Sequence, residues 1–301
     1  MDTLQNKLAA GRFVITVEVT PPVSFARADL TAKAAPLKGL ADAVNVTDSA
    51  GARAHMGALA AAAILIQDGI EPILQLTCRD RNRIGLQSDL MGAAALGIRN
   101  MLILRGDDPS AGDQPDAKPV FDLDARGLIE TARRLRDDNE LPGGRKVAGA
   151  AAFFLGAADS PIDPPPGWEP KGLAAKVAAG AQFAQTQFCM DADIVQRYTA
   201  RLAEHGLSDL KLIVGIAPLR SGKSARWMKE KLFGTIIPDA TVARLEAAAD
   251  PAAEGRAIAV DLIEQLAAIP GVAGVHIMAP NNDAAVPDVI RAARARIARL
   301  A

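Results

Sequence analysis

The sequence predicts a closed (β/α)8 barrel, a parallel α/β fold in which eight strands alternate with helices. Three observations lead to this expectation. Eight short apolar runs occur along the 301 residues, and they show little of the two-residue alternation that marks a sheet with one wet face. Segments with helical spacing separate the runs, and many of them end in a glycine just before the next run. Eight such units in about this length match what a barrel needs.

The predicted strands are short, lack interior proline and have the composition of strands buried on both faces. In chain order they are Phe13–Val19, Ala43–Val46, Ile73–Leu76, Met101–Leu104, Val147–Phe154, Phe183–Phe188, Leu210–Ile216 and Val272–Met278.

Helices are expected between these strands, and a further helix is expected at the C-terminal end of the barrel. The clearest helical segments are Ala54–Gln67, Ile84–Leu96, Ala125–Asp138, Ala192–Glu204 and Ala253–Ala268. The glycines that would stop helices are Gly69, Gly97, Gly180, Gly206 and Gly271. Two stretches, Asp107–Phe121 and Ala157–Pro170, are irregular; the second is rich in proline and is expected to be an active-site loop.

A doubly wound open sheet is the main alternative to the barrel. That fold would place a glycine-rich turn after its first strand, whereas here Val19 is followed by Thr20, Pro21 and Pro22. No linker divides the chain convincingly. We therefore expect residues 1–301 to form a single barrel that is also the catalytic domain.

Composition excludes several classes of function. Half of the residues are hydrophobic and 23% are charged, which suits a full-sized core. The net charge is −1 and the basic residues are dispersed, so neither a nucleic-acid partner nor a membrane anchor is expected. No signal peptide or membrane-spanning run is present, so a cytoplasmic location is expected. Two cysteines and scattered histidines do not have the spacing of a metal site.

Reactive groups in such a barrel project from the carboxyl ends of the strands. Polar or distinctive residues at these ends, or just after them, are Glu18, Thr47, Gln75, Leu104, Arg105, Gly106, Asp107, Phe153, Gln187 and His276. Glu18 is the most informative, because a carboxylate inside an apolar strand must face a cavity or an ion-pair partner. Burial would raise its pKa and suit it to general-acid catalysis. A structural pair with Arg105 is an equal alternative from sequence position alone.

The other candidates carry weaker signals. Arg105, Gly106 and Asp107 offer a cation, an open backbone and an anion, although alone they could form only a polar turn. Gln75 and Gln187 could contact the edge of a heterocycle or be satisfied core amides. Lys176 could meet a phosphate or cover its own helix, and taken alone it favours the surface role.

Five segments in order resemble one family, the flavin-dependent methylenetetrahydrofolate reductases of the bacterial single-domain type. The resemblance covers nearly the whole chain. The segments are VEVTPP from Val17, QLTCRDRNRIGLQSDLMGAAALGI from Gln75, LILRGDDP from Leu102, KVAAGAQFAQTQF from Lys176 and GVAGVHIM from Gly271.

The resemblance implies a barrel that binds FAD rather than FMN and works by ping-pong exchange. NADH or NADPH would reduce the flavin and leave, and a folate would then take its place, so that 5,10-methylene- and 5-methyltetrahydrofolate are interconverted. Glu18 matches the general acid that opens the ring of the methylene bridge to an iminium. Asp107 matches an aspartate whose charge favours that cation.

The resemblance also assigns binding roles. Flavin contacts would come from Thr47, Gln75, Leu104, Arg105, Gly106, Asp107, Phe153 and Lys176. Folate contacts would come from Glu18, Gln187, Leu245 and His276. The sequence departs from the better-known bacterial pattern at Gln75, at Phe153, at Leu245 (where a phenylalanine often stacks on the ligands) and in the insert at Pro164–Pro166.

Other functions remain open at this stage. One is a flavin-free folate-dependent methyltransferase or lyase on the same barrel, and another is a subunit that only binds flavin or folate. A third is a reductase subunit that relies on an iron–sulfur partner subunit, since two cysteines cannot hold a cluster here. A homo-oligomer is also left open.

Overall fold

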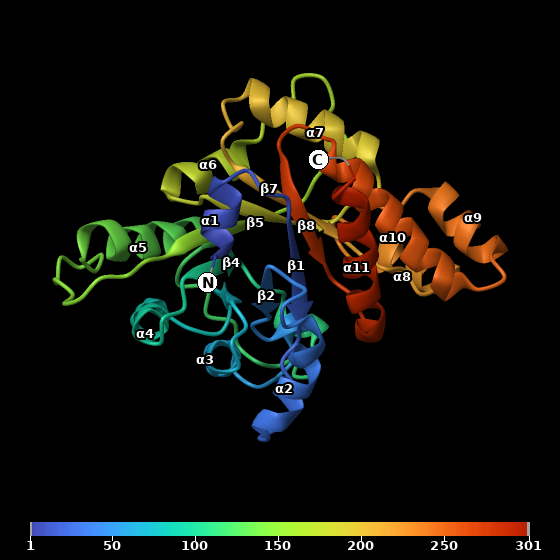
Figure 1. Ribbon diagram of the computed structural model, residues 1–301. Helices are drawn as coiled ribbons and strands as arrows, with labels where there is room; N and C mark the ends of the chain where they lie inside the picture. Colours follow the sequence, from blue (N-terminus) through green and yellow to red (C-terminus); the bar gives the residue numbers. More distant parts are fainter. Residues whose placement is uncertain (1, 300–301) are drawn as a thin grey trace.

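The computed structural model describes residues 2–299 and contains a closed barrel of parallel strands, β1 to β8 in chain order (Figure 1). The strands are β1 (Val14–Val19), β2 (Ala43–Val46), β3 (Pro72–Thr77), β4 (Asn100–Leu104), β5 (Phe154–Asp159), β6 (Phe183–Phe188), β7 (Lys211–Ile216) and β8 (Val272–Ile277). The last strand pairs with the first, with Thr16 opposite His276, which closes the sheet. The predicted (β/α)8 fold is confirmed.

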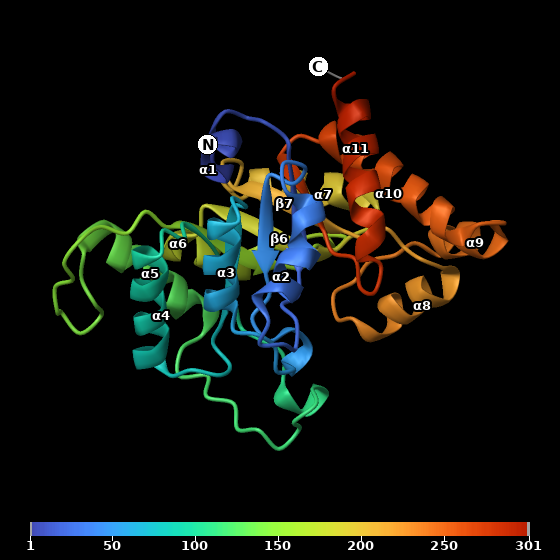
Figure 2. The same cartoon turned by 60° about the horizontal axis from the view of Figure 1, so that its bottom comes forward.

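Helices surround the barrel (Figures 1 and 2). They are α1 (Leu4–Ala9), α2 (Arg27–Ala34), α3 (Ala58–Gln67), α4 (Arg83–Ala95), α5 (Ala125–Asp138), α6 (Lys171–Ala179), α7 (Ala192–Glu204), α8 (Gly222–Lys231), α9 (Asp239–Ala247), α10 (Pro251–Ala267) and α11 (Val286–Ile297). Short 3₁₀ turns are η1 (Ala35–Leu37), η2 (Ala50–Ala52), η3 (Pro109–Ala111) and η4 (Asp283–Ala285). Helix α11 is the expected C-terminal helix and completes the eighth strand–helix unit.

The expected fifth strand was wrong in position. Val147–Phe154 was expected, whereas β5 begins at Phe154 and ends at Asp159. The run before β5 is apolar because it is rich in alanine and glycine, which have low strand propensity and form an irregular connection here. Phe153 and Phe154 therefore lie at the amino end of β5, and the proline-rich loop begins after Asp159.

The amino end of the barrel is filled by apolar side chains. Leu4 and Leu8 of α1 are almost completely buried against inward-facing strand residues. The rings of Phe154 and Phe183 stack there with centroids 4.8 Å apart. Gly156 makes room for this packing, since a Cβ atom at that position would lie 2.2 Å from the Phe183 ring.

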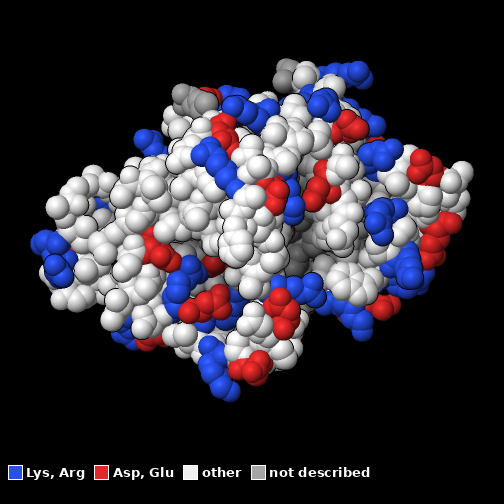
Figure 3. Space-filling model, turned by 90° about the horizontal axis from the view of Figure 1, so that it is seen from below, with Lys and Arg blue, Asp and Glu red and all other residues white. Residues whose placement is uncertain are grey.

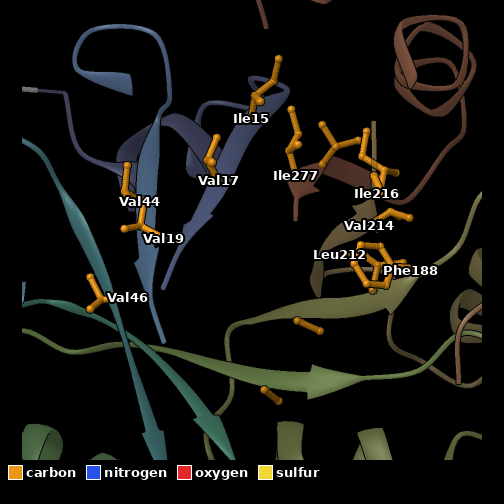
Figure 4. Packing of buried hydrophobic residues seen from close by; sticks show 14 of the residues in the cluster. Ile15, Val17, Val19, Val44, Val46, Phe188, Leu212, Val214, Ile216 and Ile277 are labelled. Atoms are coloured by element: carbon orange, nitrogen blue, oxygen red, sulfur yellow. The ribbon is translucent and has the colours of Figure 1, made fainter. Parts of the chain in front are cut away.

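A second and larger core lies between the strands and the surrounding helices. Outward-facing strand side chains such as Val17, Val44, Val214 and Ile277 belong to it (Figure 4). Because β1 alternates between this core and the barrel interior, Glu18 points inward between two outward-facing valines. Within residues 2–299, no helix combines the length and the apolar character needed to cross a membrane.

Candidate active site

A polar cavity of about 390 Å³ opens at the carboxyl ends of the strands. We call it the mouth cavity. The view toward this end of the barrel shows a hollow with acidic and basic side chains around it (Figure 3). Residues that line it are Glu18, Thr47, Asp48, Gln75, Thr77, Arg79, Leu104, Arg105, Gly106, Asp107, Asp159, Ser160, Gln185, Gln187, His276 and Met278, among others. Most of the predicted site residues are thus brought together here.

Glu18 lies at the end of β1 with its carboxyl group in the barrel interior. Gln75 Nε2 donates a hydrogen bond of 3.4 Å to Glu18 Oε2. Burial raises the pKa of Glu18 to about 7, and the charges of Asp283 and Asp107 act in the same direction, while the Gln75 hydrogen bond opposes them. A carboxyl group with this pKa can hold a proton near neutral pH and release it to a bound ligand.

Arg105 is not the ion-pair partner of Glu18. Its guanidinium group lies over the ring of Phe121, 4.4 Å from the centroid. This contact lies in the long connection after β4, which projects from the barrel (Figure 2). The expected alternative of a structural pair between Glu18 and Arg105 is therefore wrong, and the chemical role of Glu18 stays a prediction.

Gly106 and Asp107 follow β4 and shape one wall of the mouth cavity. Gly106 has φ +91°, and a Cβ atom there would lie 2.9 Å from Cβ of Arg79 and 3.1 Å from Cβ of Thr77. Only glycine fits both the backbone angle and the close approach. Asp107 Oδ2 accepts a hydrogen bond of 3.0 Å from the backbone N–H of Gly51, which fixes the carboxylate at the rim.

Thr47 stands beside Asp48 at the end of β2. Asp48 accepts hydrogen bonds from the backbone N–H and the hydroxyl group of Thr77, at 2.8 and 3.0 Å, and pairs with Arg81. This contact ties β2 to β3. Thr47 lines the cavity, and its buried hydroxyl oxygen has no hydrogen-bond partner among residues 2–299.

A ladder of buried polar side chains lies beneath the mouth and crosses the barrel from β8 to β2. His276 Nδ1 lies 3.0 Å from Thr16 Oγ1, and Gln185 Nε2 donates to the same oxygen at 3.1 Å. Gln185 Oε1 in turn accepts a hydrogen bond of 2.6 Å from Asn45 Nδ2. Burial lowers the pKa of His276 to about 3, so the imidazole is neutral. Its buried Nε2 atom has no hydrogen-bond partner within residues 2–299.

Sequence reasoning missed Thr16, Asn45 and Gln185. A signal was present, because each lies two residues before a predicted site residue that is on the same strand or directly follows it: Glu18, Thr47 and Gln187. Residues two apart on a strand share a face, so polar residues at these positions point into the barrel as well.

Gln187 and Lys176 make local contacts in this structure. Gln187 Nε2 donates a hydrogen bond of 3.2 Å to the carbonyl oxygen of Phe233, whose side chain is 93% exposed. Gln187 Oε1 accepts a hydrogen bond from the N–H of Phe188. Lys176 Nζ donates a hydrogen bond of 2.6 Å to the carbonyl oxygen of Ala158, at the end of β5. Phe233 is a further candidate contact that the sequence did not indicate.

Three predicted site residues are absent from the lining of the mouth cavity: Lys176, which bonds to Ala158, together with Phe153 and Leu245. Phe153 precedes β5 and lines a groove of about 300 Å³ between α4 and α5. Leu245 is on α9 and is completely buried in the outer core. Neither side chain lies where its predicted contact requires, because β5 begins later than expected and α9 packs outside the barrel.

Metal and thiol chemistry have no support in the described part of the chain. Among residues 2–299, no group of three or more His, Cys, Asp or Glu side chains is placed to hold a metal ion. Both cysteines are buried, and burial raises the pKa of Cys78 to about 11 and that of Cys189 to about 12. Both are therefore protonated thiols near neutral pH.

A closed parallel barrel whose strand ends surround a carboxyl group of raised pKa, a second carboxylate and other polar side chains defines the class: a TIM barrel with a candidate ligand site at its strand ends. A family model described as methylenetetrahydrofolate reductase matches residues 3–294. The chain belongs to this family.

Individual relatives are more distant. Methylenetetrahydrofolate reductase 2 of Schizosaccharomyces pombe is 30% identical over 185 residues, which are 60% of this chain and 28% of that protein. The 5,10-methylenetetrahydrofolate reductase of Salmonella typhimurium is 28% identical over 162 residues, 52% of this chain and 47% of that protein. The matched regions thus span less than half the length of these curated relatives.

A solved structure from Clostridium thermocellum superimposes with a TM-score of 0.65 at 13% identity and covers 97% of this chain and 98% of that one. That protein is described as uncharacterized and as binding two copies of 5-methyl-5,6,7,8-tetrahydrofolic acid. At this level of identity the likeness shows a shared fold.

Proposed function

We propose that this protein is a flavin-dependent reductase that interconverts 5,10-methylenetetrahydrofolate and 5-methyltetrahydrofolate, with NADH or NADPH as electron donor. The observation that carries the proposal is the pairing of two different carboxyl groups in one cavity. Glu18 has a pKa raised to about 7, while Asp107 is held at the rim by the Gly51 N–H. Membership of the family supplies the substrate class.

Reduction of the methylene bridge needs one proton and one hydride. Glu18 would give its proton to the bridging nitrogen that leaves the methylene carbon, and the bond between that nitrogen and the carbon would break. The product of this step is an iminium cation on the other nitrogen. Because the cation forms in a partly dry cavity, the fixed negative charge of Asp107 would stabilise it more than it would in water.

The residues present fit a flavin at the mouth. Thr47 and Gly106 line the cavity, and rotation of the Thr47 side chain would bring its hydroxyl group, which has no partner among residues 2–299, to the ring system. Arg105 and Gln75 line the same cavity and could contact the carbonyl and nitrogen atoms of the ring edge. When bound, FAD would take a hydride from the nicotinamide and deliver it to the folate.

The folate would lie on the side of His276 and Gln187. His276 lines the cavity with a neutral imidazole, which keeps its protonation state across the physiological pH range, and a small rotation of the ring would bring its buried Nε2 atom to the folate. Gln187 would have to share or exchange its hydrogen bond with Phe233 in order to contact a pterin ring. Its first role is therefore to hold the chain segment at Phe233 against the cavity.

The test is the visible absorption spectrum of the anaerobic protein before and after NADH and then methylenetetrahydrofolate. We expect a flavin spectrum that NADH bleaches and the folate restores. Glu18→Gln should lose the folate step, by 10²-fold or more as an approximate lower bound for a general acid, and should keep the NADH step. Glu130→Gln, an exposed glutamate on α5, is the matched control.

Three outcomes would contradict the proposal. A colourless protein that binds neither FAD nor FMN would point to a flavin-free folate enzyme. Loss of both half-reactions in Glu18→Gln would show that Glu18 is needed for the fold or the flavin, and loss of neither would remove it from the chemistry.

A further inference from the structure

A second cavity, of about 260 Å³, lies beside β1. We call it the side cavity. Its walls come from β1, α2, η1, η4 and the start of α11. The inner wall is apolar and buried, and includes Val17, Leu37 and Val286. The outer rim is exposed and includes Ala32 and Asp283, so the side cavity reaches the surface of the molecule.

Glu18 lines both the side cavity and the mouth cavity. Glu18 therefore borders both cavities, and its carboxyl group lies on the barrel side of β1. The polar residues around the side cavity are Thr20, Lys33 and Asp283, and Lys33 Nζ donates a hydrogen bond of 3.2 Å to the carbonyl oxygen of Thr20. The volume is well above the roughly 10–15 Å³ that one water molecule needs, and these three residues are the polar partners that would hold a chain of waters along the otherwise apolar wall.

The proposed reaction creates a need for such a route, and the inference rests on that proposed function. Each turnover takes one proton from Glu18 and leaves a carboxylate that must be protonated again. Ligands bound in the mouth cavity would cover the Glu18 carboxyl group and block its access to solvent from that side. Proton return from the mouth would then have to wait until a ligand leaves.

We propose that the side cavity is the route by which Glu18 regains its proton from solvent, and that Asp283 is the proton-relaying residue at its entrance. A solvent acid protonates the Asp283 carboxylate, Asp283 releases this proton to the water chain, and the chain delivers one to the Glu18 carboxylate. One O–H bond breaks and one forms at each transfer, and no oxidant or reductant takes part.

The electrostatics agree with the geometry of this route. Two carboxylates act on Glu18 through their charge: Asp283 from the segment after β8 and Asp107 from the connection after β4. Lys33 of α2 lies at the edge of the side cavity. The other charged residues that line the mouth cavity are Asp48, Arg79, Arg105 and Asp159. Asp283 is close enough for its charge to raise the pKa of Glu18. Asp283 itself is exposed at the start of η4, so it can exchange protons with bulk solvent.

The experiment compares single-turnover and steady-state rates of folate reduction in variants of the complete flavin-loaded protein. Ala32→Leu fills the side cavity from an exposed helical position, where leucine is compatible with the fold. Ala28→Leu, one turn earlier on α2 and outside the cavity lining, is the matched control. Asp283→Asn removes the relaying group with little change in shape.

Asp283→Asn also removes a charge that raises the pKa of Glu18, so single turnovers are started well below pH 7, where Glu18 is protonated in every variant. Under that condition all four proteins should reduce one folate at the same rate. In steady state Ala32→Leu and Asp283→Asn should slow by about tenfold, within the range that proton transfer contributes to catalysis, and small buffer acids should partly rescue Asp283→Asn. Equal steady-state rates in Ala32→Leu and Ala28→Leu would overturn the route. Slowing already in the single turnover would assign the side cavity to ligand binding instead.

Failure of the proposed function gives a different pattern, because the unmodified protein would then turn over no folate in either regime. A test that does not depend on turnover follows the infrared band of the Glu18 carboxyl group after a rapid change of pH. The band is assigned by its absence in Glu18→Gln. With folic acid added to cover the mouth, protonation should be slower in Ala32→Leu than in Ala28→Leu. Equal protonation rates would exclude the side cavity as the path.

Discussion

The hydroxyl oxygen of Thr16 accepts a hydrogen bond from Gln185 and lies 3.0 Å from Nδ1 of His276. One side chain on β1 therefore holds both an amide from β6 and an imidazole from β8. Because a buried polar group without a partner is costly, this shared oxygen fixes the orientation of His276.

Thr16→Val should reveal this role. The valine has a similar shape but leaves His276 and Gln185 each short of a partner, so the free energy of unfolding should fall by about 1–3 kcal/mol. Thr16→Ser keeps the hydroxyl group and should lose less. Urea unfolding of the three proteins measures the effect, and equal losses in both variants would mean that the methyl group, and not the hydrogen bonds, matters.

The stability of the protein should depend on pH through Glu18. The pKa of Glu18 in the folded state, about 7, is above the ordinary value of 4.5. Its contribution to the free energy of unfolding is therefore fully present below pH 4.5 and is lost as the pH rises through 7. Glu18→Gln lacks this loss. The free energy of unfolding of Glu18→Gln, measured relative to that of the unmodified protein, should therefore increase by up to about 3 kcal/mol between pH 5 and pH 8. A constant difference across that range would contradict the raised pKa.

Gly106→Ala should disrupt the flavin wall. The new methyl group would meet Cβ of Arg79 at 2.9 Å in a backbone conformation that disfavours alanine. We expect a loss of about 1–3 kcal/mol in stability and weaker flavin retention on gel filtration. Gly144→Ala has a similar φ of +85° with no atom within 4 Å of the new Cβ, so it isolates the effect of the contact. Normal flavin content in Gly106→Ala would remove this glycine from the cofactor site.

Asp107→Asn should slow the folate half-reaction by about 10- to 100-fold, because it removes the charge that favours the cation. The same change removes a charge that raises the pKa of Glu18, so the pH midpoint of this half-reaction should move downward. Stopped-flow rates across pH measure both. Asp108→Asn alters the exposed neighbouring carboxylate and should change neither; a matching shift there would indicate a general charge effect.

Phe233→Ala tests the exposed ring beside Gln187. Since the side chain is 93% exposed, its loss should change stability by no more than about 0.5 kcal/mol. If a planar ligand packs on this ring, KM for folate should rise several-fold while the rate of NADH oxidation by the flavin stays unchanged. Leu96→Ala, an exposed residue at the C-terminal end of α4, controls for the loss of surface apolar area. An unchanged KM would exclude the contact.

Much of the fold could be predicted from the sequence because strand and helix ends carry local signals. Ala125–Asp138 and Ala192–Glu204 match α5 and α7 residue for residue, and the expected stop glycines all take left-handed conformations. The strand after Ala152 was misplaced because alanine-rich apolar runs have no strand preference of their own. Apolar composition alone could not decide between a strand and the connection before it.

The site was predictable where it follows strand ends and unpredictable where it depends on packing. Glu18, Thr47 and Asp107 share the mouth cavity, as the strand ends indicated. Leu245 was inferred from resemblance, and its position was decided by how α9 packs on the outer core. Asp283 lies on a short turn with no motif of its own. Its relation to Glu18 arises only because β8 closes the barrel against β1.

The N-terminal helix seals the amino end of the barrel with Leu4 and Leu8, and the N–H of Leu4 is anchored to the Glu71 carboxylate. Large molecules can therefore reach the inner side chains of the strands only from the opposite end. On the proposed function, a nicotinamide and a folate would compete for this single entrance, so one must leave before the other binds. Double-reciprocal plots of initial rate against nicotinamide concentration, at several fixed folate concentrations, should then be parallel lines. At high concentration, each ligand should inhibit the half-reaction of the other.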